Sequence, residues 1–123
     1  MPFNNITGLV ETYIAGADLT GSQYLFVKVN GATVVVAGDG EEAVGVLWNN
    51  PGDTRAASVV RGGDPTVYAG AAIAAGIDVA SDAAGKAVEA ASGDFVLGKT
   101  RAAVASANDL VQIEFYRGGN LVA

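Results

Sequence analysis

The chain has 123 residues, seven of them basic and thirteen acidic, which gives a formal net charge of −6 at pH 7. It contains no Cys and no His, which excludes disulfides, thiolate metal sites, cysteine nucleophiles and the commonest general base. The basic residues are scattered along the chain, so we expect no nucleic acid partner, because binding a phosphate backbone needs a clustered positive surface.

The first half reads as a series of strands separated by turns. Residues 24–29 alternate with period two, and Asn30-Gly31 then leads into residues 33–36, which predicts a hairpin with a type I′ turn. Residues 42–48 and 55–61 predict two further strands, with turns at 38–40, 51–53 and 62–65.

The second half repeats this rhythm. Short strands are expected at 67–68, 77–80, 86–91 and 95–97, and the alternation of Val111, Ile113 and Phe115 with polar neighbours predicts a longer one. Helix propensity favours a short helix only at residues 100–107, which are Ala-rich. We therefore predict a mainly β fold: a small β-barrel or β-tulip-like domain of antiparallel hairpins with at most one or two short helices.

The two halves also echo each other. Ala15-Gly16-Ala17 returns in the second half as Ala69-Gly70-Ala71, and Arg61-Gly62-Gly63 returns at nearly the same spacing as Arg117-Gly118-Gly119. An internal repeat is one interpretation, and chance similarity in an Ala/Gly-rich chain is the other.

Residues 93–100, Gly-Asp-Phe-Val-Leu-Gly-Lys-Thr, match the phosphate-binding pattern G-x-x-x-x-G-K-[ST]. That chemistry needs a loop whose backbone N–H groups surround phosphate. Here the loop interior has one acidic and three bulky apolar residues, and the stretch after Thr100 is too short for the rest of a nucleotide-binding sheet. We therefore do not expect nucleotide binding.

Other chemical signals are weaker. Lys86 follows a turn glycine as a lipoyl-carrier lysine does, but its neighbours Gly85 and Ala87 lack the carrier signature. Asp39, Glu41 and Glu42 lack the alternation of a calcium loop and are expected to form a solvated hairpin tip. No catalytic set can be assembled, so we predict a protein that is not an enzyme and has no cofactor or metal.

Half of the residues are apolar, but most of these are Ala and Val. A core of small side chains leaves part of the burial to an oligomer or a docked partner. Aromatic residues beside turns are favoured interface anchors, and the interface candidates are Trp48, Tyr68, Tyr116 and the turn residue Arg61.

Three segments carry a resemblance to a known family. Residues 39–47 combine an acidic turn with an Ala-Val-Gly-Val-Leu strand, residues 54–60 form a β-branched strand, and residues 61–68 hold a basic-Gly turn and a strand with an aromatic residue. This arrangement resembles the head-decoration proteins of lambda-like tailed bacteriophages. More loosely, the whole chain is similar to phage capsid-stabilising proteins.

The resemblance implies a structural virion protein, made in the host bacterial cytoplasm, that binds the outside of the expanded phage head as a homotrimer at three-fold positions and stabilises the major capsid protein lattice. Such a role needs an arm that orders on the lattice, and the apolar residues near the start predict a capsid-binding arm at residues 1–14, anchored by Phe3, Ile6, Leu9 and Val10, followed by a single β-rich domain at residues 15–123. No membrane partner is expected, since no window reaches the roughly 20 apolar residues of a span. The alternatives are a head fibre or host-surface adhesion module, and an unrelated cytoplasmic β domain.

Overall fold

The computed structural model describes residues 10–120, with side chains described as far as Tyr116, and over this range it contains ten strands and no helix. Strands β1 to β5 close into a barrel in the order β1-β3-β2-β4-β5. Their bounds are β1 Val10–Ala15, β2 Phe26–Asn30, β3 Thr33–Val36, β4 Gly45–Leu47 and β5 Ala56–Val60. The predicted mainly β fold class is confirmed.

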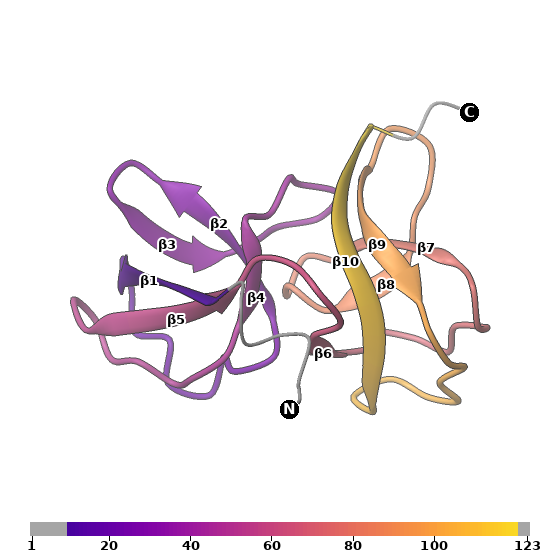
Figure 1. Ribbon diagram of the computed structural model, residues 1–123, viewed down its shortest axis with the longest axis horizontal. Helices are drawn as coiled ribbons and strands as arrows, with labels where there is room; N and C mark the ends of the chain where they lie inside the picture. Colours follow the sequence, from indigo (N-terminus) through magenta and orange to yellow (C-terminus); the bar gives the residue numbers. More distant parts are fainter. Residues whose placement is uncertain (1–9, 121–123) are drawn as a thin grey trace.

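Strands β6 to β10 form a second sheet in the order β6-β10-β9-β7-β8, beside the barrel (Figure 1). Their bounds are β6 Thr66–Tyr68, β7 Asp78–Ser81, β8 Ala87–Glu89, β9 Phe95–Thr100 and β10 Leu110–Asn120. Strand β10 continues through Gly118 and Gly119 to Asn120. In the part of the chain that the structure describes, no helix is long and apolar enough to span a membrane.

The predicted hairpin at Asn30-Gly31 is confirmed, with Asn30 paired to Thr33 across a two-residue loop. Gly31 has a φ of 64°, whereas Ala32 does not have a positive φ. These signs fit a type II′ turn, which needs glycine at its first central position, and not the expected type I′ turn.

The helix expected at residues 100–107 is wrong. Thr100 ends β9, and Val104 instead forms a backbone bridge with Ile73, each residue donating its N–H to the carbonyl of the other at 2.8 and 3.0 Å. Because these backbone groups bond across the sheet, they are not available for the bonds of a helical turn. Tertiary pairing has overridden a local alanine preference.

The two sheets are structural repeats of each other. Reading from β3, the barrel runs β3-β2-β4-β5-β1, and reading from β8, the second sheet runs β8-β7-β9-β10-β6. The registers also agree. Tyr13 pairs with Ala57 in the barrel, and Val67 pairs with Val111 in the second sheet. The number of positions from Tyr13 to Val67 equals the number from Ala57 to Val111. A parallel contact between the first and third strands closes the barrel, and the bridge between Ala69 and Ala87 occupies the same place in the second sheet.

Single backbone bonds repeat as well. Thr54 N–H donates to Ala15 O, and Asn108 N–H donates to Ala69 O, with the same sequence offset for donor and acceptor. Thr54 and Asn108 both adopt positive φ, at 66° and 71°, which is uncommon for residues other than glycine. Matched topology, register and backbone strain favour the internal repeat over chance similarity. We call residues 10–61 the first repeat and residues 64–120 the second.

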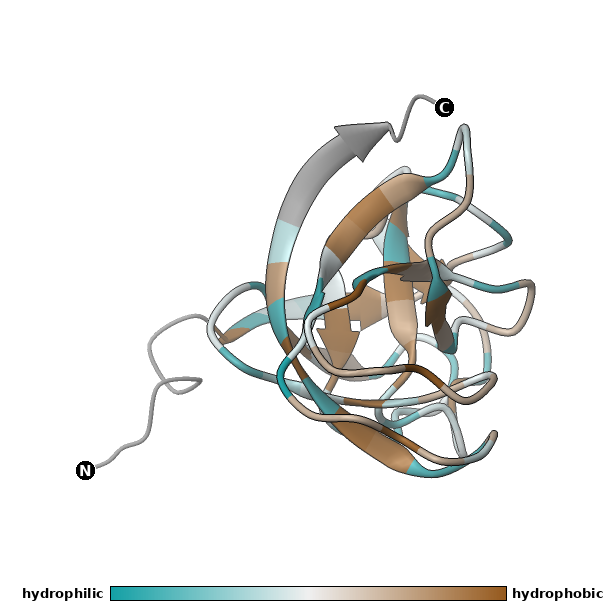
Figure 2. Cartoon of the chain, turned by 90° about the vertical axis from the view of Figure 1, so that its right-hand side faces the viewer, coloured by the Kyte–Doolittle hydropathy of each residue, from teal (hydrophilic) through white to brown (hydrophobic). Residues whose placement is uncertain are grey.

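The two repeats share one buried cluster, and the barrel has a second cluster of its own. A cluster inside the barrel contains Val27, Val34 and Leu47. A larger cluster joins the interior of the second sheet to Phe26 and Val46 of the first repeat. Adjacent residues Phe26 and Val27 thus point to opposite sides of β2 and are both fully buried. Hydrophobic residues concentrate in the strands and hydrophilic residues at the turns (Figure 2).

Candidate functional site

A surface groove of about 630 Å³ lies where the two repeats meet. We call it the seam groove. The first repeat contributes both charged and aromatic side chains to it, and the second contributes Phe95 from the start of β9. The charged and aromatic lining residues from the first repeat are Tyr13, Lys28, Glu41, Glu42 and Arg61. A groove of mixed charge with apolar walls is suited to binding a peptide segment.

Glu41 organises one wall of the seam groove. Its Oε1 accepts a hydrogen bond from Lys28 Nζ at 2.7 Å and another from the Gly38 N–H at 2.6 Å. The bond from Lys28 lowers the pKa of Glu41 below its ordinary value of 4.5, and the bond from the Gly38 backbone lowers it further. The acidic turn at residues 38–42 is therefore held against β2 by a charge-assisted bond.

Acid should weaken this wall. Because the pKa of Glu41 is lower in the folded state, its contribution to stability is full above about pH 4.5, the ordinary value, and is lost as the pH falls through the folded pKa. We expect the melting temperature of the wild type to exceed that of Glu41→Gln at about pH 7, and the difference to shrink towards about pH 3. Thermal unfolding across this range measures it.

Glu89→Gln, on the exposed end of β8, is the matched control for loss of one negative charge. A melting-temperature difference for Glu41→Gln that stays constant across the whole pH range would contradict the role given to Glu41.

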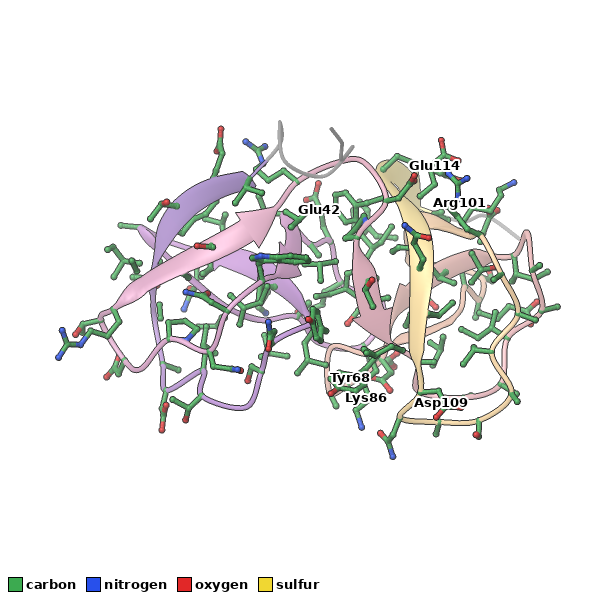
Figure 3. All side chains as sticks on the ribbon, turned by 60° about the horizontal axis from the view of Figure 1, so that its bottom comes forward. Glu42, Tyr68, Lys86, Arg101, Asp109 and Glu114 are labelled. Atoms are coloured by element: carbon green, nitrogen blue, oxygen red, sulfur yellow. The ribbon has the colours of Figure 1, made fainter. Side chains whose placement is uncertain are left out.

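An aromatic cluster lies at another part of the junction between the repeats. The ring of Tyr24 makes edge contacts with Trp48 and with Tyr68, both at centroid distances of 6.0 Å. Tyr68 also donates its backbone N–H to Tyr24 O. Two of the predicted interface aromatics are thus brought together by a residue that the sequence placed only on a strand. Figure 3 shows Tyr68 and Lys86 close together near this junction.

The other two interface candidates lie apart from this cluster. Arg61 donates to Glu11 Oε1 at 2.9 Å and lines the seam groove. Tyr116 is 38% exposed on β10 and donates its hydroxyl to Asp78 Oδ1 at 3.3 Å. Partial burial is the main cause that raises the pKa of Tyr116, with the Asp78 carboxylate adding to it. Trp48, at 36%, is about as exposed as Tyr116.

The predicted arm falls mostly outside the described residues, since Phe3, Ile6 and Leu9 precede Val10. Val10 begins β1, which pairs with β5 along its whole described length except at its last residue. The part of the arm within the described range, residues 10–14, is thus a barrel strand. The capsid-binding role of the arm stays a prediction.

The segment that matched the nucleotide-binding pattern is not a phosphate loop. Its residues 95–100 form β9, and the buried Gly98 lies in that strand against the backbone of β10. The ladder with β10 directs backbone groups of β9 to a neighbouring strand, whereas a phosphate site needs them to converge on an open concavity.

The remaining chemical candidates are also tied into the fold. Lys86 Nζ donates to Asn108 Oδ1, which ties the turn to the loop before β10. Among the described residues, no group of three or more potential ligand side chains is placed to hold a metal ion.

No protein-family model matches the chain, and no curated protein matches it significantly. Among solved structures, the chain is similar to the N base of the head fiber protein gp8.5 of bacteriophage phi29, solved by crystallography. The two share 16% sequence identity and a TM-score of 0.71, and the match covers 89% of this chain and 95% of the other. At this identity, the comparison establishes a shared fold across nearly the whole of both chains.

Proposed function

We propose that this chain is a structural protein of a bacteriophage head that binds the outer surface of the expanded head and stabilises the major capsid protein lattice. The observation that carries the proposal is the fold match, since the matched protein is named as the base of a head fiber and almost its entire length is covered. The sequence resemblance to head-decoration proteins supports the same location independently. We propose the major capsid protein and further copies of this chain, as a homotrimer, as its partners.

The fold suits this role physically. A protein that clamps a lattice needs a rigid scaffold and a contact surface, and each copy that binds only the assembled state stabilises that state by linkage. Here two hydrogen-bonded sheets share one buried core. The seam groove and the cluster of Tyr24, Trp48 and Tyr68 offer charged and aromatic contacts on that scaffold.

Co-sedimentation of the purified protein with expanded, undecorated phage heads tests the proposal. Saturable binding that raises the temperature at which the heads release their contents is the result expected of a stabilising protein. Saturable binding without any gain in head stability would favour the alternative, the base of a head fibre, which the name of the matched structure also favours. Failure to bind cognate heads would overturn both.

The predicted arm gives a second test. Replacing Phe3, Ile6 and Leu9 by Ser removes three apolar anchors that precede the described barrel. We expect head binding to weaken by about tenfold or more, since a few apolar anchors carry most of the energy of an interface. We expect the melting temperature of the free protein to change little.

Substitution of three apolar residues within the barrel would unfold the protein, so the matched control uses surface positions. Ala71, Ala72 and Ala74, all exposed in the loop after β6, are replaced by Ser. Equal head binding by the wild type and the triple arm variant would refute the arm.

A further inference from the structure

The two repeats contact each other through different faces. The first repeat uses Tyr24, Phe26, Gly40 and Val46, which we call its front face, and the second uses Tyr68, Ser81, Gly85 and Phe95, which we call its back face. Contact between unlike faces is heterologous, and such a contact leaves one face of each kind unused at the two ends.

The junction between the repeats combines backbone bonds with apolar packing. Phe26 N–H donates to Gly85 O at 2.8 Å, and Gly40 N–H donates to Ser81 O at 2.9 Å. The ring centroids of Phe26 and Phe115 lie 6.4 Å apart. One repeat therefore recognises the next both by strand-edge bonds and by a buried aromatic residue.

The equivalent back face of the first repeat is open. In the β2–β4 ladder Val27 pairs with Gly45, and in the β7–β9 ladder Val79 pairs with Gly98, so Val79 is the counterpart of Val27. Val29 and Ser81 each lie two residues further along the chain and are therefore counterparts as well. Ser81 is fully buried at the junction, whereas Val29 is 51% exposed and lines the edge of the seam groove. Gly85 is buried and Gly31, at the tip of the corresponding hairpin, is exposed.

The neighbouring counterpart shows the same contrast. Ile14 pairs with Ala56 in the first repeat, and Tyr68 pairs with Leu110 in the second. The number of positions from Ile14 to Tyr68 equals the number from Ala56 to Leu110, so Ile14 is the counterpart of Tyr68. Tyr68 packs against Tyr24, whereas Ile14 is 45% exposed. Two large apolar side chains, Ile14 and Val29, thus lie uncovered where the second repeat has covered residues.

The backbone at Val29 has the geometry of an open strand edge. Asn30 and Thr33 close the hairpin, so the peptide groups of Val29 point away from β3. On that side β4 pairs only with Phe26 and Val27. An exposed edge of this kind is a template for pairing with another chain.

The equivalent front face of the second repeat is also open. The ladders make Asp78 the counterpart of Phe26 and Lys99 the counterpart of Val46. Phe26 and Val46 are fully buried, whereas Lys99 is exposed and Asp78 is half-buried. Lys99 Nζ lies 3.6 Å from Asp78 Oδ1. A shallow hollow of about 280 Å³ lies here, lined by Ile77 and Ala90 as well as by these two residues.

We propose that copies of this chain associate front to back: the open back face of the first repeat, with Ile14 and Val29, docks on the open front face of the second repeat of another copy, with Ile77, Asp78 and Ala90. The contact reuses the arrangement that joins the repeats within one chain. It closes into a ring when the rotation per copy divides a full turn, and otherwise extends as a filament. It does not depend on binding to a phage head.

Cross-linking tests the direction of this contact, and a chain without Cys makes the test clean. Val29→Cys is the back-face probe. Lys99→Cys is the front-face probe, because the exposed Lys99 lines the hollow on that face. With a short bis-maleimide, we expect dimers when the two variants are mixed and none from either variant alone. Dimers from Val29→Cys alone would overturn the front-to-back arrangement.

Sedimentation without phage heads tests the energetics. We expect the wild type to associate reversibly at concentrations up to about 1 mM, and Val29→Arg to raise the dissociation constant by about tenfold or more. Leu110→Arg, at an apolar position 48% exposed outside both open faces, is the matched control and should change it by less than about twofold. A wild type that stays monomeric over this range would refute the proposal.

Discussion

Replacing Phe26 by Ala is expected to destabilise the protein by about 3–5 kcal/mol, as for other fully buried aromatic residues. Phe26 is fully buried, and its ring belongs to the core cluster that joins the two repeats. Its loss leaves a cavity between the repeats, beside Phe115. Among the described residues, Phe26 is the one aromatic residue that the first repeat contributes to that cluster, so no other ring of this repeat takes its place.

Guanidinium unfolding measures this effect with two signals. The single Trp, Trp48, reports on the first repeat by fluorescence, and far-ultraviolet circular dichroism reports on both sheets. Coincident transitions are expected, because the repeats share one core. Leu110→Ala, at a position 48% exposed, should cost less than about 1 kcal/mol. A loss for Phe26→Ala as small as this, or two separate transitions for the wild type, would contradict a shared core.

Much of the fold could be predicted from the sequence because its strands have one buried face and short turns. In β10, the buried residues Val111, Ile113 and Phe115 alternate with exposed polar neighbours, which is the pattern of a half-buried strand. The glycine after Asn30 marked the first hairpin. These signals are local, and local backbone preference agrees with the fold at these places.

Other features depend on contacts between distant segments. All of strand β1 except Ala15 lies within the residues 1–14 that were assigned to an arm. Its inward residues Tyr13 and Ala15 are separated by the exposed but apolar Ile14, and they become covered only when β3 and β5 close the barrel. Phe26 and Val27 are both buried, so period-two alternation does not reveal the second face of β2. That face exists only because the second repeat packs against it.

The candidate site was harder to predict than the fold. Trp48 and Tyr68 were expected at an interface, but the residue that joins them, Tyr24, adopts a φ of 70° that no sequence pattern indicated. Gly76 occupies the counterpart position in the second repeat, with a φ of 73°. The comparison of the repeats thus identifies Tyr24 as a residue held in a backbone conformation that favours glycine. In this strained conformation the ring of Tyr24 contacts two other aromatic rings, those of Trp48 and Tyr68.

Replacing Gly45 by Ala is expected to destabilise the protein by about 3 kcal/mol, because overpacking against a rigid backbone is not relieved by a side-chain rotation. A Cβ at Gly45 would overlap the backbone carbonyl oxygen of Val60, and it would lie 2.7 Å from Val59 Cγ1. The same close approach recurs in the second repeat, where a Cβ at Gly98 would overlap Glu114 O. Both glycines lie where the fourth strand of a repeat crosses the fifth, so Gly98→Ala should have a similar effect.

Gly52→Ala is the matched control for these two variants. A Cβ at Gly52 would meet only Arg55 Cγ, at the ordinary distance of 3.7 Å, and its φ is not positive. Alanine there restricts the unfolded chain without straining the folded one, so the free energy of unfolding should stay unchanged or rise by up to about 1 kcal/mol. If Gly45→Ala and Gly98→Ala behaved like Gly52→Ala, the close crossing of strands would not constrain either repeat. A loss at both positions and none at Gly52 is the result expected of two repeats built on the same backbone crossing, and at Gly98 the φ of 155° adds backbone strain to the overlap.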